Sequence, residues 1–447
     1  MTSLVGPYPL DGITMPTWLL RFDKHGACTS PITRQQLLET LQNDDTTDVI
    51  VFSHGWNNNF SSATGLYTRF LEGLEALTEA HALARDNRPY RPLFIGVVWP
   101  SIWLSFDEGP QILFMPQQPH EVRADSEVAH AMADELVAHS DAIDLERLYG
   151  LLGQNVLTTE EAHELAALVT PLFSHVDDET GIAWEASAED VLEMMQAMQA
   201  AQMASTEIQQ LRPTGLLKRI DPRSVLRLFS VYQMKDRAGI VGARGVAKLL
   251  QDLLAEGMAA RVHAVGHSYG GKVMLSALCA PSKLARPLDS LLLLQPAVSH
   301  LCFADRIPEN NKSGGYRSAV ERVTAPILCT YSRHDSALHR TFHLALRRQR
   351  DLGEQDLRAV EFVVDPSTTA GKPPSPFAAL GGYGPRLASQ HLVDPMPAAS
   401  EPYHHFLDKK APIIGLDGSE ERRIRSHGDV TTPVTAWALH QLMAYHG

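Results

Sequence analysis

Residues 262–278 read VHAVGHSYGGKVMLSAL and contain a G-x-S-x-G motif centred on Ser268. A short apolar run precedes the motif and a stretch with helical spacing follows it, so the motif joins a predicted strand to a predicted helix. A turn this sharp forces its central serine into a strained backbone conformation. Glycine is required at Gly266 and Gly270 because the strand and helix backbones approach closely there. We therefore predict that Ser268 is a nucleophile at a helix N-terminus; the alternative is an ordinary glycine-rich turn.

Strand-like and helix-like segments alternate on both sides of this motif. We predict strands at 17–22, 48–53, 93–99, 262–265, 289–294, 327–331 and 359–364, and helices at 33–42, 62–85, 241–256, 337–350 and 433–445. Such alternation predicts an α/β fold whose mostly parallel central sheet is covered by helices on both faces. Residues 366–426 hold 9 of the 28 prolines, and we predict a long irregular excursion there.

The alternation breaks between about residues 104 and 235. Segment 104–211 holds 21 acidic and 2 basic residues, whereas the rest of the chain holds 31 acidic and 37 basic residues. This one segment therefore carries the whole acidic bias of the chain, whose net charge is −13. Because the segment shows helical patterns and no convincing strand, we predict a core formed by 1–103 and 236–447, with an acidic helical insertion over 104–235 that resembles a cap or lid.

Apolar residues within the insertion admit two interpretations. They comprise a stripe at helical spacing and several aromatic residues: Val191, Leu192, Met194, Met195, Met198, Trp103, Phe106, Phe114, Phe173 and Trp184. One interpretation is a flexible, Met-rich surface over the pocket that accommodates acyl chains. The other, which we favour for most of these residues, is the core of a small helical subdomain with an acidic exterior.

Composition excludes several classes of protein. Apolar residues make up 44% and charged residues 20% of the chain, which is ordinary for a globular protein with a sizeable core. The negative net charge argues against a nucleic-acid partner. We find no signal peptide, no apolar run that could span a bilayer, and no disulfide or metal spacing among the four cysteines. We expect a cytoplasmic protein that needs no cofactor and no metal.

Two distant residues are candidates to activate the serine. A serine hydroxyl needs a neighbouring base, which is usually a histidine oriented by a carboxylate. Asp335 lies just past the predicted strand 327–331, and His427 lies in the loop before the last predicted helix. Asp335 could instead be a turn or helix-cap residue, and Asp365 is the rival acid. The histidines that compete with His427 are His404, His405, His391 and His334.

The chain order Ser268, Asp335, His427 resembles that of the α/β-hydrolase superfamily of serine esterases and lipases. The resemblance covers about 48–101 and 240–447 and leaves the insertion unexplained. It implies an α/β-hydrolase fold in which Ser268 attacks the substrate, His427 transfers the proton and Asp335 orients the imidazole.

The sequence His54-Gly55-Trp56, which follows the strand 48–53, matches the oxyanion loop of this superfamily. The resemblance implies that the backbone N–H groups of Trp56 and Tyr269 donate to the oxyanion of a tetrahedral intermediate. It also implies substrate contacts by the residues beside these two, which are His54, Gly55, Asn57 and His267.

Two further features are less specific. The run Asn57-Asn58-Asn59 either holds the oxyanion loop by side-chain hydrogen bonds or begins the following helix, and the sequence favours neither. Lys272 is predicted to be a solvated helix residue with no catalytic role.

The resemblance implies hydrolysis of a carboxylic ester through an acyl-enzyme, with a small-molecule acyl ester, lipid-like esters included, as substrate. An acidic insertion disfavours docking on anionic lipid, which favours a soluble esterase over an interfacial phospholipase. The same triad serves thioesterases, amidases and peptidases, and the fold does not choose among them. A non-catalytic binding protein that retains the fold is the alternative from another class.

Overall fold

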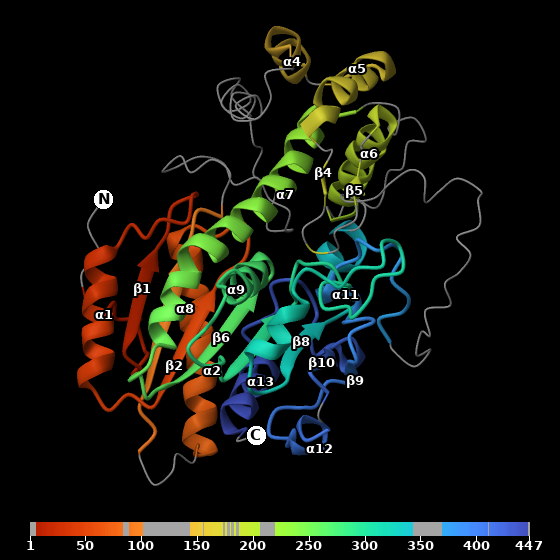
Figure 1. The fold of residues 1–447 in the computed structure, drawn as a ribbon. Helices are drawn as coiled ribbons and strands as arrows, with labels where there is room; N and C mark the ends of the chain where they lie inside the picture. The colour runs from red at the N-terminus through yellow and green to blue at the C-terminus, as the bar shows by residue number, and fades with distance from the viewer. Residues whose placement is uncertain are drawn as a thin grey trace.

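The computed structural model describes residues 6–83, 89–101, 144–342, 369–409 and 411–445, with gaps inside 144–342 at 155, 173–174, 177–178, 180–182, 185–186 and 206–219. Figure 1 shows a central sheet flanked by helices, with a group of further helices beyond one end of the sheet.

Eight of the described strands form one sheet, in which every neighbouring pair is parallel. In spatial order they are β1 (Thr17–Arg21), β3 (Pro92–Val98), β2 (Asp48–Ser53), β6 (Arg261–His267), β7 (Ser290–Leu294), β8 (Ile327–Tyr331), β10 (Ile413–Asp417) and β9 (His391–Val393). Every residue of β2 and β7 is buried, as expected for parallel strands covered on both faces. The predicted α/β architecture with a mostly parallel sheet is therefore confirmed.

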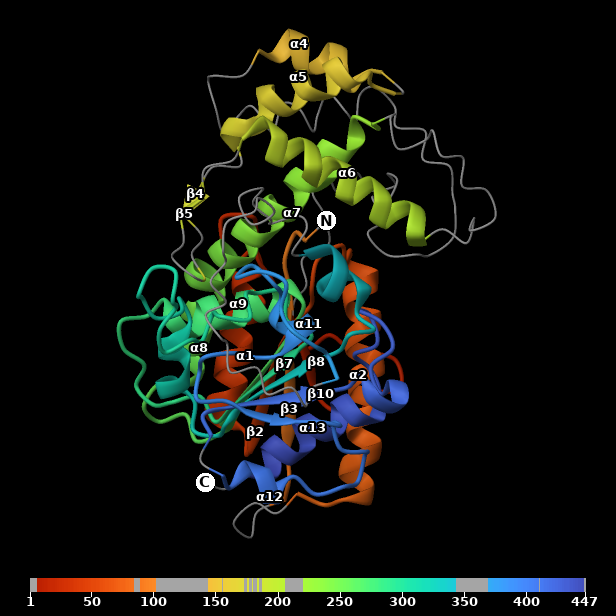
Figure 2. The same ribbon diagram turned by 90° about the vertical axis from the view of Figure 1, so that its right-hand side faces the viewer.

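Helices cover both faces of this sheet, as Figure 2 shows. On one face lie α1 (Pro31–Asn43), α8 (Ala247–Leu253) and α9 (Tyr269–Cys279); on the other lie α2 (Phe60–Ala80) and α13 (Pro433–Ala444). In α2 the residues Leu66, Phe70 and Leu74 share one face at helical spacing. All three are buried in the core that lies between the sheet and the helices α2 and α13. Within the described ranges, no helix is long and apolar enough to cross a membrane.

Part of the predicted insertion forms a helical group beyond the sheet (Figures 1 and 2). It contains α4 (Leu145–Leu152), α5 (Thr159–Val169), α6 (Ala188–Ser205) and the start of α7 (Arg223–Ile240). Antiparallel β4 (His175–Val176) and β5 (Ala183–Trp184) form a strand pair that the sequence analysis did not predict. Two-residue strands carry too little periodicity to be recognised.

Helix α7 continues through a π-helical segment, Val241–Val246, directly into α8. The helix predicted to begin at 241 therefore begins at Arg223, and it crosses the position 235/236 at which the sequence analysis divided core from insertion. Close packing accounts for the small residues at the π-helical segment, since a Cβ on Gly242 would lie 2.3 Å from the backbone oxygen of Val273 in α9.

The apolar stripe of α6 is buried in the same core as the sheet residues. Val191, Leu192, Met194 and Met195 all lie in that core. This burial supports the interpretation of these four as the core of a helical subdomain. The side chains of Met198 and of the aromatic residues named with the stripe lie outside the described part of the structure.

The prediction of an irregular excursion over 366–426 was wrong in one important respect. The segment contains the sheet strands β9 and β10, together with the short helices α11 (Leu380–Tyr383) and α12 (His404–Leu407). Strand β10 is fully buried between β8 and β9. Four apolar or small residues followed by Asp417, between proline-containing loops, gave too short a signal to separate a strand from a loop.

Short helical segments complete the described structure: Thr170–Leu172, Arg317–Arg322 and Glu420–Arg422 are 3₁₀-helical, and Ala337–Thr341 is π-helical. The last of these is the described beginning of the helix predicted at 337–350. The remainder of that helix and the predicted strand 359–364 lie outside the described residues.

Candidate active site

The candidate site lies where the connections of the sheet reverse direction. From β2 the chain runs to β3 on one side, whereas β6 lies on the other side of β2. In parallel α/β sheets, the crevice outside the carboxyl ends of strands at such a point is the usual place for a ligand. Ser53 pairs with Gly266, so the segments that follow β2 and β6 leave the sheet side by side.

Ser268 occupies a strained turn between β6 and α9. Its φ is 56° and its ψ is −125°, a conformation that costs a non-glycine residue about 1–3 kcal/mol. A Cβ on Gly266 would lie 2.6 Å from the backbone oxygen of Gly270, and a Cβ on Gly270 would lie 2.0 Å from that of Ser53. The predicted strain and the predicted need for both glycines are therefore present in the structure.

The structure brings Ser268, Asp335 and His427 together. His427 Nε2 lies 2.9 Å from Ser268 Oγ, and His427 Nδ1 lies 2.8 Å from Asp335 Oδ2. Ser268 is 4% exposed, the His427 side chain is 13% exposed, and Asp335 is fully buried. In the arrangement that activates a serine, Nδ1–H donates to the carboxylate and Nε2 accepts the proton of the hydroxyl. Both distances allow these hydrogen bonds.

Asp335 makes both of the contacts that the sequence left open. While Oδ2 faces His427, Oδ1 accepts a hydrogen bond from the backbone N–H of Leu338 at 3.0 Å. The same carboxylate therefore caps the first turn after β8 and contacts the histidine. The rival acid, Asp365, lies outside the described residues.

The histidines that competed with His427 lie elsewhere. His334 places its Nε2 3.0 Å from the backbone oxygen of Ser419. His391 is in the edge strand β9, and His404 and His405 are exposed in α12. His427 reaches Ser268 because the loop after β10 returns along the carboxyl ends of the strands before α13 begins.

The loop after β2 packs directly against the nucleophile position. A Cβ on Gly55 would lie 2.6 Å from the Cβ of Ser268, so only glycine fits there. The Asn58 amide donates to the backbone oxygens of Gly55 and Trp56, at 3.1 and 3.0 Å. Asn58 therefore holds the loop, as one of the two interpretations of the asparagine run predicted.

The other interpretation also applies, but to a different asparagine. The Asn59 side chain accepts from the backbone N–H of Ser62 at 2.7 Å and is the N-cap of α2. Asn57 adopts a positive φ of 59°, and its backbone N–H donates to the oxygen of Ser101 at 2.9 Å. The oxyanion roles of the Trp56 and Tyr269 N–H groups, and substrate contact by Gly55 and Asn57, stay predictions.

His54 braces this loop from inside the protein. Its fully buried ring stacks on Trp99, with centroids 5.6 Å apart and planes 4° apart. Nδ1 lies 2.8 Å from the backbone oxygen of Gly55, and the Trp99 backbone N–H donates to Nε2 at 3.3 Å. Burial lowers the pKa of His54 to about 4, although the hydrogen bond to Gly55 opposes the shift. The ring is therefore neutral at pH 7.

His267 contacts the loop that carries His427. Its Nε2 lies 3.0 Å from the backbone oxygen of His427, and the two rings lie 5.0 Å apart, centroid to centroid. Burial, followed by the proximity of His427, lowers the pKa of His267 to about 3. A neutral His267 can donate from Nε2 to that oxygen and thereby fix the backbone at His427. The predicted contacts of His54 and His267 with substrate stay predictions.

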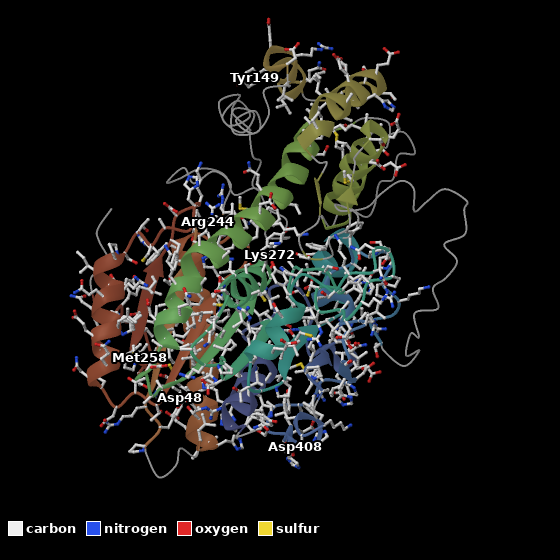
Figure 3. The ribbon with its side chains drawn as sticks, viewed as in Figure 1. Asp48, Tyr149, Arg244, Met258, Lys272 and Asp408 are labelled. Atoms are coloured by element: carbon white, nitrogen blue, oxygen red, sulfur yellow. The ribbon has the colours of Figure 1, made fainter. Side chains whose placement is uncertain are left out.

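The prediction that Lys272 is solvated was wrong. Lys272 lies one turn after Ser268 and is fully buried, in the body of the protein (Figure 3). Its Nζ lies 3.2 Å from Oε1 of Glu179, a buried residue of the insertion. Oε2 of Glu179 lies 3.5 Å from Lys235 Nζ and accepts from the backbone N–H of Ser299 at 2.6 Å. The carboxylate that pairs with the Lys272 ammonium lies 93 positions away in the sequence. No local sequence pattern could therefore have predicted that this lysine is buried.

A second serine, histidine and aspartate occur together at the opposite end of the strands. His263 in β6 has Nε2 3.0 Å from Asp48 Oδ1 in β2 and Nδ1 2.7 Å from Ser290 Oγ in β7. All three are fully buried. Burial lowers the pKa of His263, against the opposing effect of Asp48. We interpret this set as a polar link that fixes the register of three strands, because a serine without access to a substrate cannot act on one.

No protein-family model and no curated protein sequence match the chain. Among solved structures, the chain is similar to the crystal structure of an uncharacterized protein from Pseudomonas aeruginosa, at 10% identity and a TM-score of 0.19. The match covers 68% of this chain and 39% of that protein, so the chain corresponds to less than half of its length. Over the described ranges, no three His, Cys, Asp or Glu side chains are grouped so that they could hold a metal ion.

Proposed function

We propose that this chain is a serine hydrolase of the α/β-hydrolase fold that cleaves carboxylic esters of small acyl substrates through an acyl-enzyme. The observation that carries the proposal is the continuous set of contacts Ser268–His427–Asp335, at 2.9 and 2.8 Å, on a strained turn at the carboxyl ends of parallel strands. An ordinary glycine-rich turn would not require a distant histidine and a buried carboxylate aligned with the serine.

In the proposed reaction, Ser268 Oγ attacks the ester carbonyl carbon while His427 Nε2 takes the hydroxyl proton. Asp335, already bonded to Nδ1, stabilises the imidazolium that forms. Backbone N–H groups of Trp56 and Tyr269 would stabilise the oxyanion. The imidazolium then protonates the departing alkoxide, which leaves as the alcohol. Water, activated by the same histidine, releases the carboxylic acid and regenerates the serine.

The first test is labelling with a fluorophosphonate probe, which forms a covalent bond only with an activated serine. Wild type should label and Ser268→Ala should not, while Ser61→Ala, a matched change at an exposed serine, should label like wild type. A folded wild type that does not label would contradict the proposal and favour a non-catalytic binding protein.

A second experiment identifies the bond that is cleaved. Ester, thioester and amide substrates with the same acyl group would be compared by kcat/KM on one preparation of enzyme. The proposal expects the ester to have the highest value and Ser268→Ala to abolish turnover. Faster turnover of the thioester or the amide would retain the Ser268 mechanism and reassign the enzyme to that class.

A further inference from the structure

One short segment contacts Ser268, Asp335 and Ser426, the residue that precedes His427. The segment comprises Leu294, at the end of β7, and the three residues that follow it. The backbone N–H of Ser268 donates to the oxygen of Leu294, and the N–H of Ala297 donates to the oxygen of Ser268, both at 3.1 Å. Gln295 lies between Leu294 and Ala297 in the chain, and its side chain contacts Asp335 and the backbone of Ser426.

The Gln295 amide joins the acid to the histidine loop. Its Nε2 donates to Asp335 Oδ2 and to the backbone oxygen of Ser426, each at 2.9 Å. Ser426 directly precedes His427 in the chain. Because Nε2 carries two hydrogens, one nitrogen satisfies both contacts. Asp335 Oδ2 therefore accepts from His427 and from Gln295 at the same time.

The backbone of Gln295 is held in an unfavourable conformation, which fixes where its side chain begins. Its φ is 43°, a region that favours glycine. The N–H of Gln295 donates to Thr330 Oγ1 in β8 at 3.0 Å, and Gly381 packs so closely that a Cβ there would lie 2.5 Å from the carbonyl carbon of Gln295. Gln295 is also fully buried. Packing against Gly381 and the hydrogen bond to Thr330 therefore hold the backbone of a residue whose side chain contacts Asp335 and Ser426.

We propose that Gln295 is a positioning residue of the hydrolase. Its amide prevents the Asp335 carboxylate from rotating away from His427 and holds the backbone of the His427 loop at the same distance from that carboxylate. The inference rests on the proposed function, because it assigns a task within that site. A neutral donor suits the position, since a buried lysine or arginine would neutralise Asp335, and asparagine is one methylene too short to reach both acceptors.

The first test replaces the amide with an apolar side chain of similar length. Gln295→Met should lower kcat, and the rate of fluorophosphonate labelling, by about 10- to 100-fold, which corresponds to a hydrogen bond to a charged group. KM should change little, because Gln295 does not contact the substrate in the proposed mechanism. Gln35→Met, the same change at an exposed glutamine of α1, is the matched control and should behave as wild type.

The pH profile separates positioning from general stabilisation of the fold. A carboxylate that has lost one donor attracts the imidazolium more strongly, so the acid limb of the rate profile of Gln295→Met should move to higher pH. Gln295→Glu keeps the shape of the side chain. Its protonated form can still donate to Asp335, whereas its ionised form repels both acceptors. Its rate relative to wild type should therefore fall as the pH rises.

The outcomes distinguish the two proposals. If wild type labels at Ser268 while both Gln295 variants retain the wild-type rate and pH profile, the positioning role is overturned and the hydrolase stands. If folded wild type does not label, the hydrolase proposal and the inference fall together. Should Gln295→Met fail to fold, the near-isosteric Gln295→Glu decides, and a pH-independent ratio to wild type would refute the role.

Discussion

Oε1 of Glu179 lies 3.2 Å from Nζ of Lys272, and both side chains are excluded from solvent. The contact joins the predicted acidic insertion to α9, the helix that follows Ser268. The other carboxylate oxygen of Glu179 accepts from the N–H of Ser299, in the loop that follows Gln295. A single carboxylate from the segment that we predicted to be an insertion thus contacts both α9 and the loop that follows Gln295.

Glu179→Gln should strongly destabilise the protein. Removing one partner of a buried ion pair leaves an uncompensated charge and typically costs about 3–5 kcal/mol. Here Lys235 and Lys272 would both lose their shared carboxylate. The free energy of unfolding in denaturant measures the loss. Glu164→Gln breaks the exposed Arg147–Glu164 pair and should have little effect; equal losses for the two variants would contradict the importance of burial.

Gly270→Ala should distort the nucleophile turn. The new Cβ would lie 2.0 Å from the backbone oxygen of Ser53, so β2 and α9 would have to separate. Overpacking a core typically costs about 1–3 kcal/mol, and we expect Gly270→Ala to lower the free energy of unfolding by about 3 kcal/mol or more. We also expect it to abolish labelling at Ser268. Gly150→Ala in α4 meets no atom within 4 Å and should stabilise its helix by about 0.5–1 kcal/mol. Thermal unfolding compares the two, and an unperturbed Gly270→Ala would refute the close approach.

Asp335→Asn should abolish most of the proposed esterase activity and leave the fold intact. An amide that presents its NH₂ to His427 Nδ1 favours the tautomer in which Nε2 carries the proton and cannot accept one from Ser268. In enzymes with such a triad, the change lowers kcat on the order of 10⁴-fold. The comparison is kcat for an ester substrate against Asp408→Asn, an exposed aspartate far from the sheet's carboxyl ends (Figure 3). If Asp335→Asn retained full activity, the Asp335 carboxylate would have no part in the mechanism.

The folded protein should lose stability as the pH falls from 6.5 to about 4. Burial lowers the pKa of both His54 and His300 from 6.5 to about 4. Between these values the unfolded state binds protons that the folded state does not, so acidification favours unfolding. Their stabilisation is complete above pH 6.5, and each histidine contributes on the order of 3 kcal/mol to what is lost near pH 4.

Non-titrating variants test this linkage. Asparagine at position 300 can retain the donor that lies 3.0 Å from the backbone oxygen of Ala378, but it cannot take up a proton. The free energy of unfolding of His300→Asn should therefore decline less steeply between pH 6.5 and 4 than that of wild type. His404→Asn changes an exposed histidine and should leave the slope as it is. Parallel curves for His300→Asn and wild type would show that His300 does not carry the effect.

Local signals were sufficient to predict most of the framework. The strand predicted at 327–331 has those bounds in the structure, and the predicted parallel sheet with helices on both faces is present. Strong apolar runs and glycine at a tight turn are local properties, so the sequence carries them directly. Strand β10 was missed because its five residues lie among prolines and glycines, where no periodicity can develop.

By itself, the sequence determined the strained turn at Ser268, since only glycine at positions 266 and 270 allows strand and helix to approach so closely. It also supplied the candidates Asp335 and His427, but it could not choose them from the rival acid and the competing histidines. Tertiary structure placed Asp335 and His427 in contact with each other and His427 in contact with Ser268, because the carboxyl ends of β6, β8 and β10 lie on the same side of the sheet. It also decided the burial of Lys272 against Glu179 and the contacts of Gln295. Contacts between residues dozens of positions apart leave no trace in local spacing, because only the packed sheet and helices bring them together.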